Sequence, residues 1–275
     1  MDKTMKGKMM DKSKQLEAME RLLRIMDELR EKCPWDHKQT MESLRCNTIE
    51  ETYELAGAIM ENNLDEVRKE LGDLLLHIVF YSKIGSEQGA FDFADVANGI
   101  CEKLIVRHPH VFGDTQVRSD SDIRSNWEKI KLSEGRKSVL EGIPEALPAM
   151  VKAIRLQEKA QGIGFDWSGN EGGWEKLKEE MAEFEAELKN GSSESREEEF
   201  GDMLFALIKC ARNHNIQAEN ALEKTNRKFK ARFQLMEELI NKDGKQLKEM
   251  PLSEMEPYYQ KAKAMHNRQK ETKNR

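Results

Sequence analysis

The chain has 275 residues, of which 38% are hydrophobic, 35% charged and 7% aromatic, and only 6 are prolines. This composition favours helices and is poor in the β-branched and aromatic runs that form strands, so it argues against an all-β fold. The chain carries 51 acidic and 45 basic side chains, for a net charge of −6. A protein that coats a nucleic-acid duplex carries a basic surplus, so general nucleic-acid binding is not expected.

The cysteines and the start of the chain bear on the cellular compartment. Four cysteines are scattered along the sequence without a CxxC motif, which argues against disulfides and zinc and is typical of a reducing cytoplasm. No apolar run approaches the roughly 18 residues that span a membrane. Residues 1–15 are basic and lack the apolar stretch of a secretory signal, so we expect them to form a disordered tail. The sequence therefore predicts a cytoplasmic protein that does not span a membrane.

The first helix is predicted from about Gln15, where apolar residues begin to recur at three- and four-residue steps. It should end near Cys33, because the residue before a proline is pushed out of the helical region. The segment CPWDHKQT is then predicted as a loop, in which Asp36 or Thr40 can cap the following helix. Further helices are predicted over about 41–62, 64–87, 93–107, 149–161, 174–189, 197–213 and 217–240.

A cluster of helix-breaking residues divides this pattern near the middle of the chain. Residues 133–148 contain two glycines and two prolines and are predicted as a linker. We expect an N-terminal helical domain over 16–132 and a C-terminal helical domain over 149–262. Residues 263–275 are basic and polar, and we expect them to be a frayed tail. The predicted fold class is therefore all-α, with tandem helical-bundle domains.

An internal repeat of acidic residues is the most informative feature of the sequence. A Glu-Glu-x-x-Glu motif is followed after 15 residues by Glu-x-Gly-Asp, and the whole pattern recurs 129 residues later. Matching glycines and leucines accompany the acidic positions, so the chain is predicted to be duplicated. The first copy contains Glu50, Glu51, Glu54, Glu70 and Asp73, and the second contains Glu179, Glu180, Glu183, Glu199 and Asp202.

The spacing within each copy predicts that four carboxylates meet. Glu51 and Glu54 lie three residues apart, as do Glu70 and Asp73, so each pair shares one face of a helix. The asparagine pair at 62–63 breaks the pattern, so the two helices can fold back as a hairpin. Each aspartate opens a strongly apolar segment, and an acidic group at the start of a buried helix needs a positive partner. Oxygen-only ligands suit Mg²⁺ or Mn²⁺, and such a site favours a phosphorylated small molecule.

Two other interpretations of these carboxylates stay open. One is that they are ordinary solvated helix faces, which is the better explanation for a single such motif in a glutamate-rich helix. The other is a di-iron centre of the ferritin type, which uses Glu-x-x-His on two helices. Both copies here have Glu-x-x-Asp instead, and Ala206 stands at the place equivalent to His77, so the di-iron interpretation is weak.

Several segments together resemble the MazG family of nucleoside triphosphate pyrophosphohydrolases. They are CPWDHKQT, the two acidic blocks, KLIVRHPHVF and GIGFDW. The resemblance covers about 16–263 and keeps the duplicated order. It implies an all-α fold in which the acidic helices form a bundle and two chains pair as a homodimer. It also implies Mg²⁺-dependent hydrolysis of a nucleoside triphosphate to the monophosphate and pyrophosphate.

The resemblance also implies roles for the acidic residues. Those of the second copy would be the main metal ligands, and those of the first would be their counterparts. Glu50 and Glu179 either support the ligands or orient water, and both roles are considered equally. The implied ligands are Glu180, Glu183, Glu199 and Asp202 in the second copy, and Glu51, Glu54, Glu70 and Asp73 in the first.

Basic side chains are needed next, because four carboxylates repel a triphosphate. By resemblance to the family, Lys228 and Arg232 bind phosphates, and Lys103 and Arg107 have the same spacing in the first copy. The alternative for each of them is a solvated helix residue. Other implied nucleotide contacts are Lys176, which lies one turn before Glu180, Arg196, and Tyr259, which stands where the family often has a tryptophan that could stack on a base.

Two functions are compatible with these motifs. The first is an enzyme that hydrolyses nucleoside triphosphates for house-cleaning or control of the nucleotide pool. The second is a non-catalytic helical module that binds Mg²⁺ or nucleotide as a regulatory signal. The two intact acidic sets favour catalysis. We expect the second copy to carry most of the turnover, because the place of Lys176 is taken in the first copy by the neutral Asn47.

Overall fold

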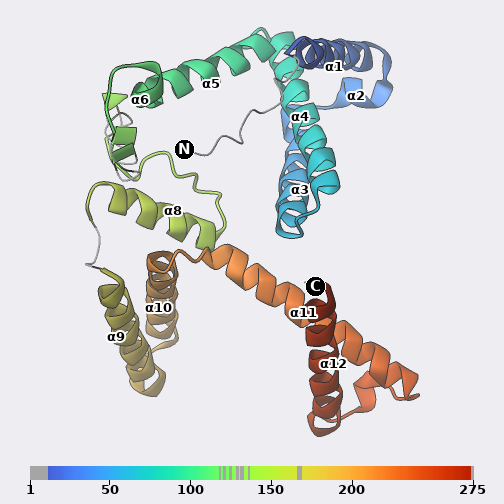
Figure 1. Ribbon diagram of the computed structural model, residues 1–275, viewed down its shortest axis with the longest axis vertical. Helices are drawn as coiled ribbons and strands as arrows, with labels where there is room; N and C mark the ends of the chain where they lie inside the picture. Colours follow the sequence, from blue (N-terminus) through green and yellow to red (C-terminus); the bar gives the residue numbers. More distant parts are fainter. Residues whose placement is uncertain are drawn as a thin grey trace. The chain divides into compact units, whose positions relative to one another are not determined.

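The computed structural model of the chain consists of helices (Figure 1). It describes residues 12–273 except 118, 120, 121, 124, 125, 128, 129, 131, 132, 136 and 166–168. Within these residues no strand is present, and the predicted all-α fold is confirmed. Of the predicted disordered tail, residues 1–11 lie outside the described part. The first helix begins at Lys12, earlier than predicted, and Ser13 donates a hydrogen bond of 2.8 Å to Glu17 within its first turns.

The chain divides into two compact units, Met1–Val117 and Arg118–Arg275. The predicted first domain, 16–132, extends 15 residues past this division, and the predicted linker, 133–148, lies within the second unit. Each unit contains a hairpin of two long helices that carries one acidic block, so the predicted tandem organisation is confirmed. Among the described helices, none is long and apolar enough to cross a membrane. All four cysteines are free thiols.

The first unit contains α1 (Lys12–Lys32), α2 (Pro34–Lys38), α3 (Met41–Met60), α4 (Leu64–Glu87), α5 (Phe93–Arg107) and α6 (Pro109–Phe112). Helix α1 packs on α4, and α3 pairs with α4 as an antiparallel hairpin (Figure 1). The prediction of a loop after α1 is wrong, because α2 occupies it. Pro34 lies in the first turn of α2, where the missing N–H of proline costs no hydrogen bond.

Polar side chains set the ends of the α3–α4 hairpin. Thr40 caps α3: its hydroxyl accepts from the Ser43 N–H at 3.1 Å, and the Ser43 hydroxyl accepts from the Thr40 N–H at 2.9 Å. Helix α3 ends near Asn62, whose φ of 54° lies in the left-handed region that asparagine tolerates better than most residues. Asn63 then caps α4 by accepting from the Glu66 N–H at 3.3 Å. The predicted break at the asparagine pair is confirmed as a tight turn.

Helices α1, α3 and α4 share one apolar core. Its α4 residues come from the C-terminal half of that helix, so the N-terminal half is left to carry the acidic residues. The core consists of Met26 from α1, Leu44 from α3, and Val79, Phe80 and Ile84 from α4.

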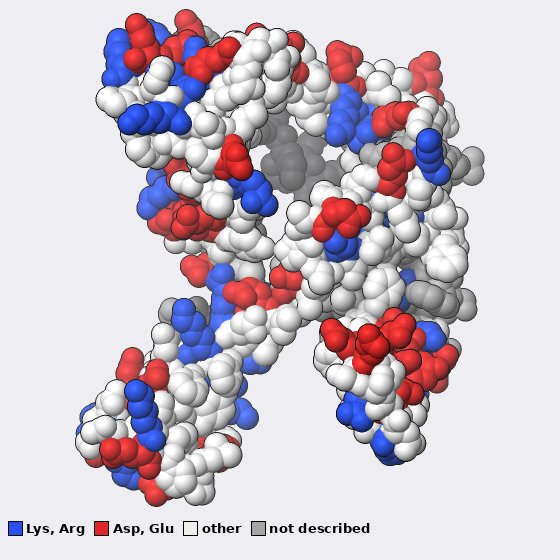
Figure 2. Space-filling model, turned by 180° about the vertical axis from the view of Figure 1, so that it is seen from behind, with Lys and Arg blue, Asp and Glu red and all other residues white. Residues whose placement is uncertain are grey.

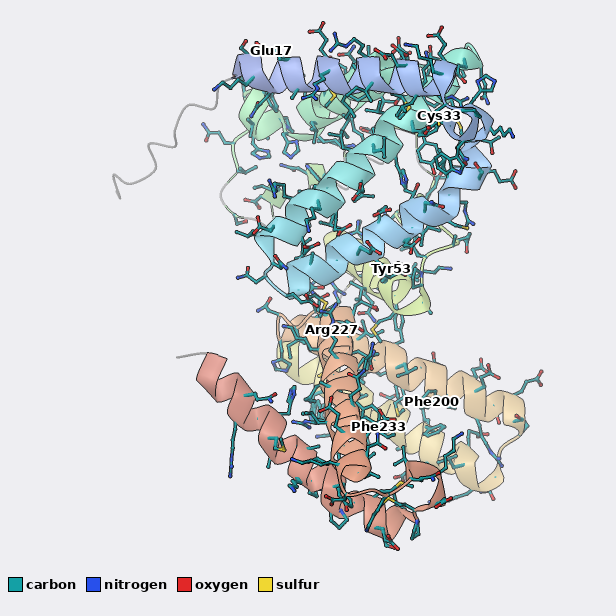
Figure 3. The ribbon with its side chains drawn as sticks, turned by 90° about the vertical axis from the view of Figure 1, so that its right-hand side faces the viewer. Glu17, Cys33, Tyr53, Phe200, Arg227 and Phe233 are labelled. Atoms are coloured by element: carbon teal, nitrogen blue, oxygen red, sulfur yellow. The ribbon has the colours of Figure 1, made fainter. Side chains whose placement is uncertain are left out.

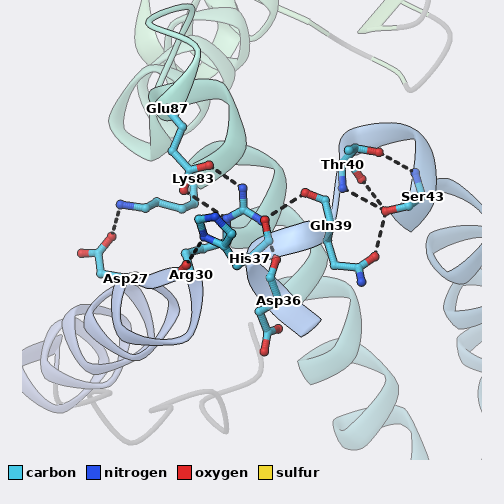
Figure 4. Close-up of polar contacts among 9 residues, drawn as sticks. All are labelled: Asp27, Arg30, Asp36, His37, Gln39, Thr40, Ser43, Lys83 and Glu87. Carbon is cyan, nitrogen blue, oxygen red and sulfur yellow. Dashed lines mark hydrogen bonds and ion pairs between the residues drawn. The ribbon is translucent and has the colours of Figure 1, made fainter. Parts of the chain in front are cut away.

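A buried arginine joins α1 to α2 and α4 through hydrogen bonds. Arg30 is 8% exposed, and its guanidinium donates two hydrogen bonds to the carboxylate of Glu87 on α4, one of them through Nε at 3.0 Å. Its Nη1 donates to the backbone carbonyls of Asp36, His37 and Gln39, the last two at 3.1 and 3.0 Å (Figure 4). These carbonyls lie at the C-terminal end of α2, where helix carbonyls lack intrahelical partners. One side chain therefore holds three helices together.

The second unit contains α8 (Ala149–Gly162), α9 (Gly169–Asn190), α10 (Ser193–Asn213), α11 (Ala218–Lys242), the 3₁₀ turn η1 (Leu247–Glu249) and α12 (Leu252–Lys273). Helix α9 pairs with α10, and α11 pairs with α12 (Figure 1). Helix α8 contacts both α10 and α11, and Gln157 on α8 donates to the backbone carbonyl of Phe205 at 2.8 Å. The two pairs have separate apolar clusters.

Helix α12 differs from the expectation drawn from the sequence. The pattern predicts that the basic residues from 263 onward fray, yet α12 is helical as far as Lys273. The reason is contact with α11: Ala262, directly before this segment, is fully buried in a cluster with Met236 and Ile240, and Asn267 within it accepts a hydrogen bond from Arg232 at 2.9 Å. The tertiary contact with α11 therefore stabilises a helix whose polar C-terminal half gives little sign of it in the sequence.

The Arg30 contacts predict a large loss of stability when this side chain is removed. Arg30→Met removes a donor from three backbone carbonyls, of which that of Asp36 keeps the Gln39 N–H, and from a partly buried carboxylate, and we expect the free energy of unfolding of the full chain to fall by about 3 kcal/mol. The measurement is denaturant unfolding followed by circular dichroism. The matched control is Lys83→Met, which removes the more exposed Lys83–Asp27 ion pair between α1 and α4 and should cost less than about 1 kcal/mol.

The same variant should change the response to acid. The hydrogen bonds from Arg30 lower the pKa of Glu87, so this pair stabilises the fold fully above the unfolded pKa of about 4.3 and loses its contribution as the pH falls through the folded pKa. Arg30→Met should therefore lose less stability than the parent chain between pH 6 and pH 3. Equal free energies of unfolding for Arg30→Met and Lys83→Met would contradict the interpretation that the hydrogen bonds of Arg30 hold α1, α2 and α4 together.

Candidate functional site

Two helical hairpins present acidic residues in the same register. In the first unit, Glu51 and Asp73 each lie eleven residues from Asn62 in the turn. In the second, Glu180 and Asp202 each lie eleven residues from Gly191. Positions equally distant from the turn of an antiparallel hairpin lie opposite each other, at the same height along the two helices. The register of the turn therefore brings distant carboxylates of the sequence together.

The structure gathers three carboxylates in each hairpin. In the first cluster, defined here as Glu51, Glu70 and Asp73, one oxygen of each carboxylate lies within 4.8 Å of the others. The same holds for the second cluster, defined as Glu180, Glu199 and Asp202. Each cluster contains three of the four carboxylates that the spacing of the sequence predicts to meet. The fourth members, Glu54 and Glu183, lie on α3 and α9 one turn beyond Glu51 and Glu180.

Close approach changes the acidity of the first cluster. Loss of hydration raises the pKa of Glu51, and the charges of Asp73, Glu54 and Glu50 raise it further. Loss of hydration also raises the pKa of Glu70, with a further contribution from the charges of Glu54 and Glu51. Among the described residues, no basic side chain forms an ion pair with a carboxylate of this cluster. The first cluster is therefore a concentration of negative charge without an ion-paired basic side chain among the described residues, although the hydrogen bond to Glu66 and, to a smaller extent, the charge of Glu70 raise the pKa of Lys69.

The second cluster shows the same crowding. Loss of hydration and then the charge of Glu180 raise the pKa of Glu183, which also shares a hydrogen bond with Glu180. Loss of hydration and then the charges of Glu183 and Asp202 raise the pKa of Glu199. Figure 2 shows acidic side chains gathered over the α9–α10 hairpin. This surface attracts cations.

A lysine compensates the second cluster. The ammonium of Lys176 lies 2.8 Å from a carboxylate oxygen of Glu179 and 2.8 Å from one of Glu180. These hydrogen bonds raise the pKa of Lys176. Glu180 is 8% exposed, so this ion pair reaches into the hairpin, whereas Glu179 is exposed. The predicted phosphate contact Lys176 thus lies against the carboxylates in this structure. Asn47, at the same place in α3, is an exposed neutral amide.

The other predicted phosphate-binding residues lie on a different pair of helices. Lys228 and Arg232 are half-buried on α11. Nη2 of Arg232 donates to the side-chain oxygen of Asn267 on α12 at 2.9 Å, and its buried Nε has no hydrogen-bond partner among the described residues. Tyr259 of α12 packs against Phe229 with ring centroids 6.2 Å apart. Within the described part of the chain, no hydrogen bond or ion pair joins this group to the second cluster.

The first-copy pair occupies equivalent positions. Lys103 and Arg107 lie ten and fourteen residues after the first residue of α5, and Lys228 and Arg232 lie ten and fourteen residues after the first residue of α11. The repeat therefore extends beyond the acidic hairpins to the following helix. Lys103 is exposed and Arg107 is half-buried.

Arg196 has a local partner. Its Nε donates to the backbone carbonyl of Glu187 at 3.1 Å and its Nη2 to that of Gly191 at 2.9 Å. These carbonyls belong to the end of α9 and the turn, so Arg196 closes the α9–α10 hairpin. Its predicted contact with nucleotide stays a prediction. The sequence signal for the turn-closing role is its position four residues into α10, directly after a glycine-containing turn.

The clusters fit a hard divalent cation. Mg²⁺ binds oxygen ligands at about 2.0–2.1 Å in an octahedron, so ligand oxygens on opposite sides lie about 4.2 Å apart. Oxygens within 4.8 Å of one another need only small side-chain rotations to reach that geometry. The donor set contains oxygen alone, which suits Mg²⁺ or Mn²⁺ better than zinc or copper. Loss of hydration, and then the charges of neighbouring carboxylates, raise the pKa values of Glu70 and Glu199, so a positive charge placed there would relieve part of this cost.

Comparison with known proteins shows which family this chain is similar to. A family model described as the MazG nucleotide pyrophosphohydrolase domain matches residues 39–112 and 170–235. The chain is 47% identical over 249 residues to the nucleoside triphosphate pyrophosphohydrolase/pyrophosphatase MazG of Thermotoga maritima, covering 89% of this chain and 95% of that protein. It is 39% identical over 257 residues to the nucleoside triphosphate pyrophosphohydrolase of Escherichia coli K12, covering 90% of this chain and 98% of that protein.

Solved structures also match, among them one from Thermotoga maritima. The crystal structure of a mazG-related protein from Thermotoga maritima aligns with 41% of this chain and 98% of its own chain, at 27% identity and a TM-score of 0.37. The two segments matched by the family model contain both carboxylate clusters and the lysine–arginine pairs of α5 and α11, whereas Tyr259 lies outside them. The family model and the two relatives confirm the resemblance drawn from the sequence motifs.

The crowding of the carboxylates predicts that removing one of them raises the melting temperature without metal and weakens the stabilisation by Mg²⁺. Glu70→Gln removes one negative charge from the first cluster, so in the presence of a chelator we expect the melting temperature to rise above that of the parent chain. Adding Mg²⁺ should raise the melting temperature of the parent chain and raise that of Glu70→Gln less. Scanning calorimetry measures both. Glu102→Gln, an exposed substitution on α5, is the matched control and should change neither value.

The pH dependence has a defined sign. The pKa values of Glu51 and Glu70 are raised in the fold, so without metal the chain loses stability as the pH rises from about 4.3 through the folded pKa values. Glu70→Gln should lose less over this window. A variant that melts below the parent chain in chelator at neutral pH, or that responds to Mg²⁺ as the parent does, would contradict the proposed repulsion.

Proposed function

The chain belongs to the MazG nucleotide pyrophosphohydrolase family, and on that premise we propose that it hydrolyses nucleoside triphosphates to nucleoside monophosphates and pyrophosphate. The observation that carries the proposal is the pair of matched carboxylate clusters on duplicated hairpins. Mg²⁺ is the proposed cofactor, and Mn²⁺ can replace it. The proposed substrates include ribo- and deoxynucleotides, and the proposed role is house-cleaning or control of the nucleotide pool in the cytoplasm.

The second cluster is the proposed main active site. The proposed oxygen ligands are Glu180, Glu183, Glu199 and Asp202. Three of them have oxygens within 4.8 Å of one another, and Glu183 shares a hydrogen bond with Glu180. A bound Mg²⁺ supplies neutralisation of phosphate charge, polarisation of the phosphorus and a more acidic water. Glu179, exposed beside the cluster, either supports the ligands or orients the water.

The chemistry requires no protein nucleophile. Water supplies the oxygen that ends on the nucleoside monophosphate, and the bond between the α-phosphorus and the bridging oxygen breaks, so pyrophosphate leaves with that oxygen. The leaving group gains negative charge, which Lys228 and Arg232 are proposed to stabilise, as Lys103 and Arg107 are in the first copy. Tyr259, which lies against Phe229, is the proposed contact for the base.

We propose that the chain acts as a homodimer. Apolar residues on one face of α10 stay exposed next to the acidic cluster: Phe200 is 44% exposed, Leu204 40% and Leu207 48%. Figure 3 labels Phe200 on α10 and Tyr53, 61% exposed, on α3. A helix hairpin with an apolar outer face is stabilised when another pair of helices covers it. A bundle formed by hairpins of two chains would cover these side chains.

The first test is the product and its dependence on metal. The full chain incubated with a mixture of nucleoside triphosphates and Mg²⁺ should release pyrophosphate and nucleoside monophosphate, measured by phosphorus NMR. Excess chelator should abolish release, and Mg²⁺ or Mn²⁺ should restore it, because all proposed ligands are oxygens. Undiminished hydrolysis in chelator would refute the metal site. Tight nucleotide binding without pyrophosphate release would favour the alternative, a non-catalytic Mg²⁺- and nucleotide-binding regulatory module.

The two copies should contribute unequally. A charge-assisted phosphate contact such as that proposed for Lys176 contributes about 1.5–3 kcal/mol, or about 10- to 100-fold in rate. Asp202→Asn should therefore leave about 1–10% of the hydrolysis, while Asp73→Asn should leave most of it. Each change is nearly isosteric, and circular dichroism should confirm that both variants fold. If Asp73→Asn is the crippling change, the first copy is the active one and the assignment is wrong.

A further inference from the structure

We propose that Lys176 is an internal counter-ion of the second cluster. This cluster then binds a divalent cation tightly only when a phosphate group accepts the hydrogen bonds of the Lys176 ammonium in place of Glu179 and Glu180. The first cluster, which has Asn47 in the same place, binds a divalent cation without that condition. The inference rests on the proposed function only for the identity of the anion, because a nucleoside triphosphate supplies phosphate. Cation entry and phosphate entry are therefore coupled in one copy and much less coupled in the other.

The contacts of Lys176 carry this inference. Its ammonium bridges Glu179 and Glu180, at 2.8 Å from one carboxylate oxygen of each. The side chain of Glu180 is only 10% exposed, so this carboxylate has few other ways to be hydrated. Glu180 is also one of the three residues whose oxygens gather within 4.8 Å. The same carboxylate therefore faces both the ammonium and the position suited to a divalent cation.

The first cluster has no such competitor. Among the described residues, Glu51, Glu70 and Asp73 form no ion pair with a basic side chain. The nearby Lys69 pairs instead with Glu66 at 2.6 Å. The first cluster is thus relieved of repulsion mainly by a cation from solution, whereas the second is already partly neutralised by its own chain. The charge of Lys176 extends to Glu183, where it partly offsets the rise in pKa.

Two cations that share one carboxylate repel each other. A divalent ion and an ammonium roughly 5 Å apart repel enough, even in the dielectric of bulk water, to lower cation affinity at least about tenfold. A phosphate that accepts hydrogen bonds from Lys176 removes this penalty. By linkage, a cation in the second cluster strengthens phosphate binding by the same factor. The lysine thereby disfavours a metal-loaded but substrate-free second site.

The experiment measures binding of Mn²⁺ alone, by electron paramagnetic resonance, to full-length chains in which one cluster is disabled. In the Glu70→Gln background only the second cluster is intact, and there Lys176→Met should raise Mn²⁺ affinity at least about tenfold. The matched control is Lys178→Met, which removes the same charge from the same helix, where Lys178 pairs with Glu175 at 2.9 Å. This control should leave Mn²⁺ affinity within about twofold.

The reverse exchange tests the first cluster. In the Asp202→Asn background only the first cluster is intact, and there Asn47→Lys should lower Mn²⁺ affinity at least about tenfold. A nucleotide analogue with a methylene bridge between its α- and β-phosphates cannot be cleaved. In the Glu70→Gln background it should raise Mn²⁺ affinity by a larger factor with Lys176 present than in Lys176→Met.

The outcomes separate this inference from the proposed function. Damage to the fold lowers metal affinity, so a rise in Lys176→Met supports the counter-ion role directly. Unchanged or lower Mn²⁺ affinity in Lys176→Met overturns it, as does an Asn47→Lys variant that binds Mn²⁺ like its parent. If the affinities change as expected but the unmodified chain releases no pyrophosphate, the inference stands and the enzymatic proposal fails. If pyrophosphate is released but the affinities do not change, the opposite holds.

Discussion

Carboxylates that are forced together repel, and the two hairpins of this chain each hold three of them within 4.8 Å. The register that causes this is set by short turns, at Asn62 in one hairpin and Gly191 in the other. No local side chain removes the cost in the first hairpin, where both partial loss of hydration and neighbouring charge raise the pKa of Glu70. The remaining fold must supply the compensating stability, and a bound cation must stabilise the folded chain more there than on an ordinary acidic surface.

That stability comes from the helix that braces each hairpin. Arg30 on α1 and Lys159 on α8 lie 129 residues apart, the offset of the repeat, and both are buried basic residues. Arg30 donates to carbonyls at the end of α2, which follows it, whereas Lys159 donates to the carbonyls of Val139 and Glu141, which precede it, at 2.9 and 3.2 Å. The duplicated position keeps a buried charge bound to backbone carbonyls, although the segment that supplies them comes from opposite directions along the chain.

The helices, the tandem repeat and the meeting of the carboxylates could be predicted, because they depend on local spacing and on a turn that Asn62 marks in the sequence. Helix α12 could not, since the buried Ala262 and the Arg232–Asn267 hydrogen bond hold it against α11, and these are contacts between distant segments. The partner of Arg30 was equally out of reach, because Glu87 lies 57 residues away. Spacing placed Lys176 one turn before Glu180, but whether its ammonium meets carboxylate or phosphate depends on what else is bound.

The position of the Lys176 ammonium matters because the chain contains two copies of the acidic hairpin. The two hairpins have the same carboxylates but different neighbours, Lys176 in one and Asn47 in the other. A divalent cation therefore competes with an ammonium group for the carboxylates of the second cluster but not for those of the first. A site without an internal counter-ion gains stability whenever metal is present, and so favours permanent occupancy. A site with an internal counter-ion gives up an existing ion pair when metal and phosphate bind together. The full binding energy of the metal is therefore realised only when substrate is also bound. The lysine that weakens the metal-only state thus links occupancy of the second cluster to the arrival of an anion, which a rigid acidic cluster cannot do alone.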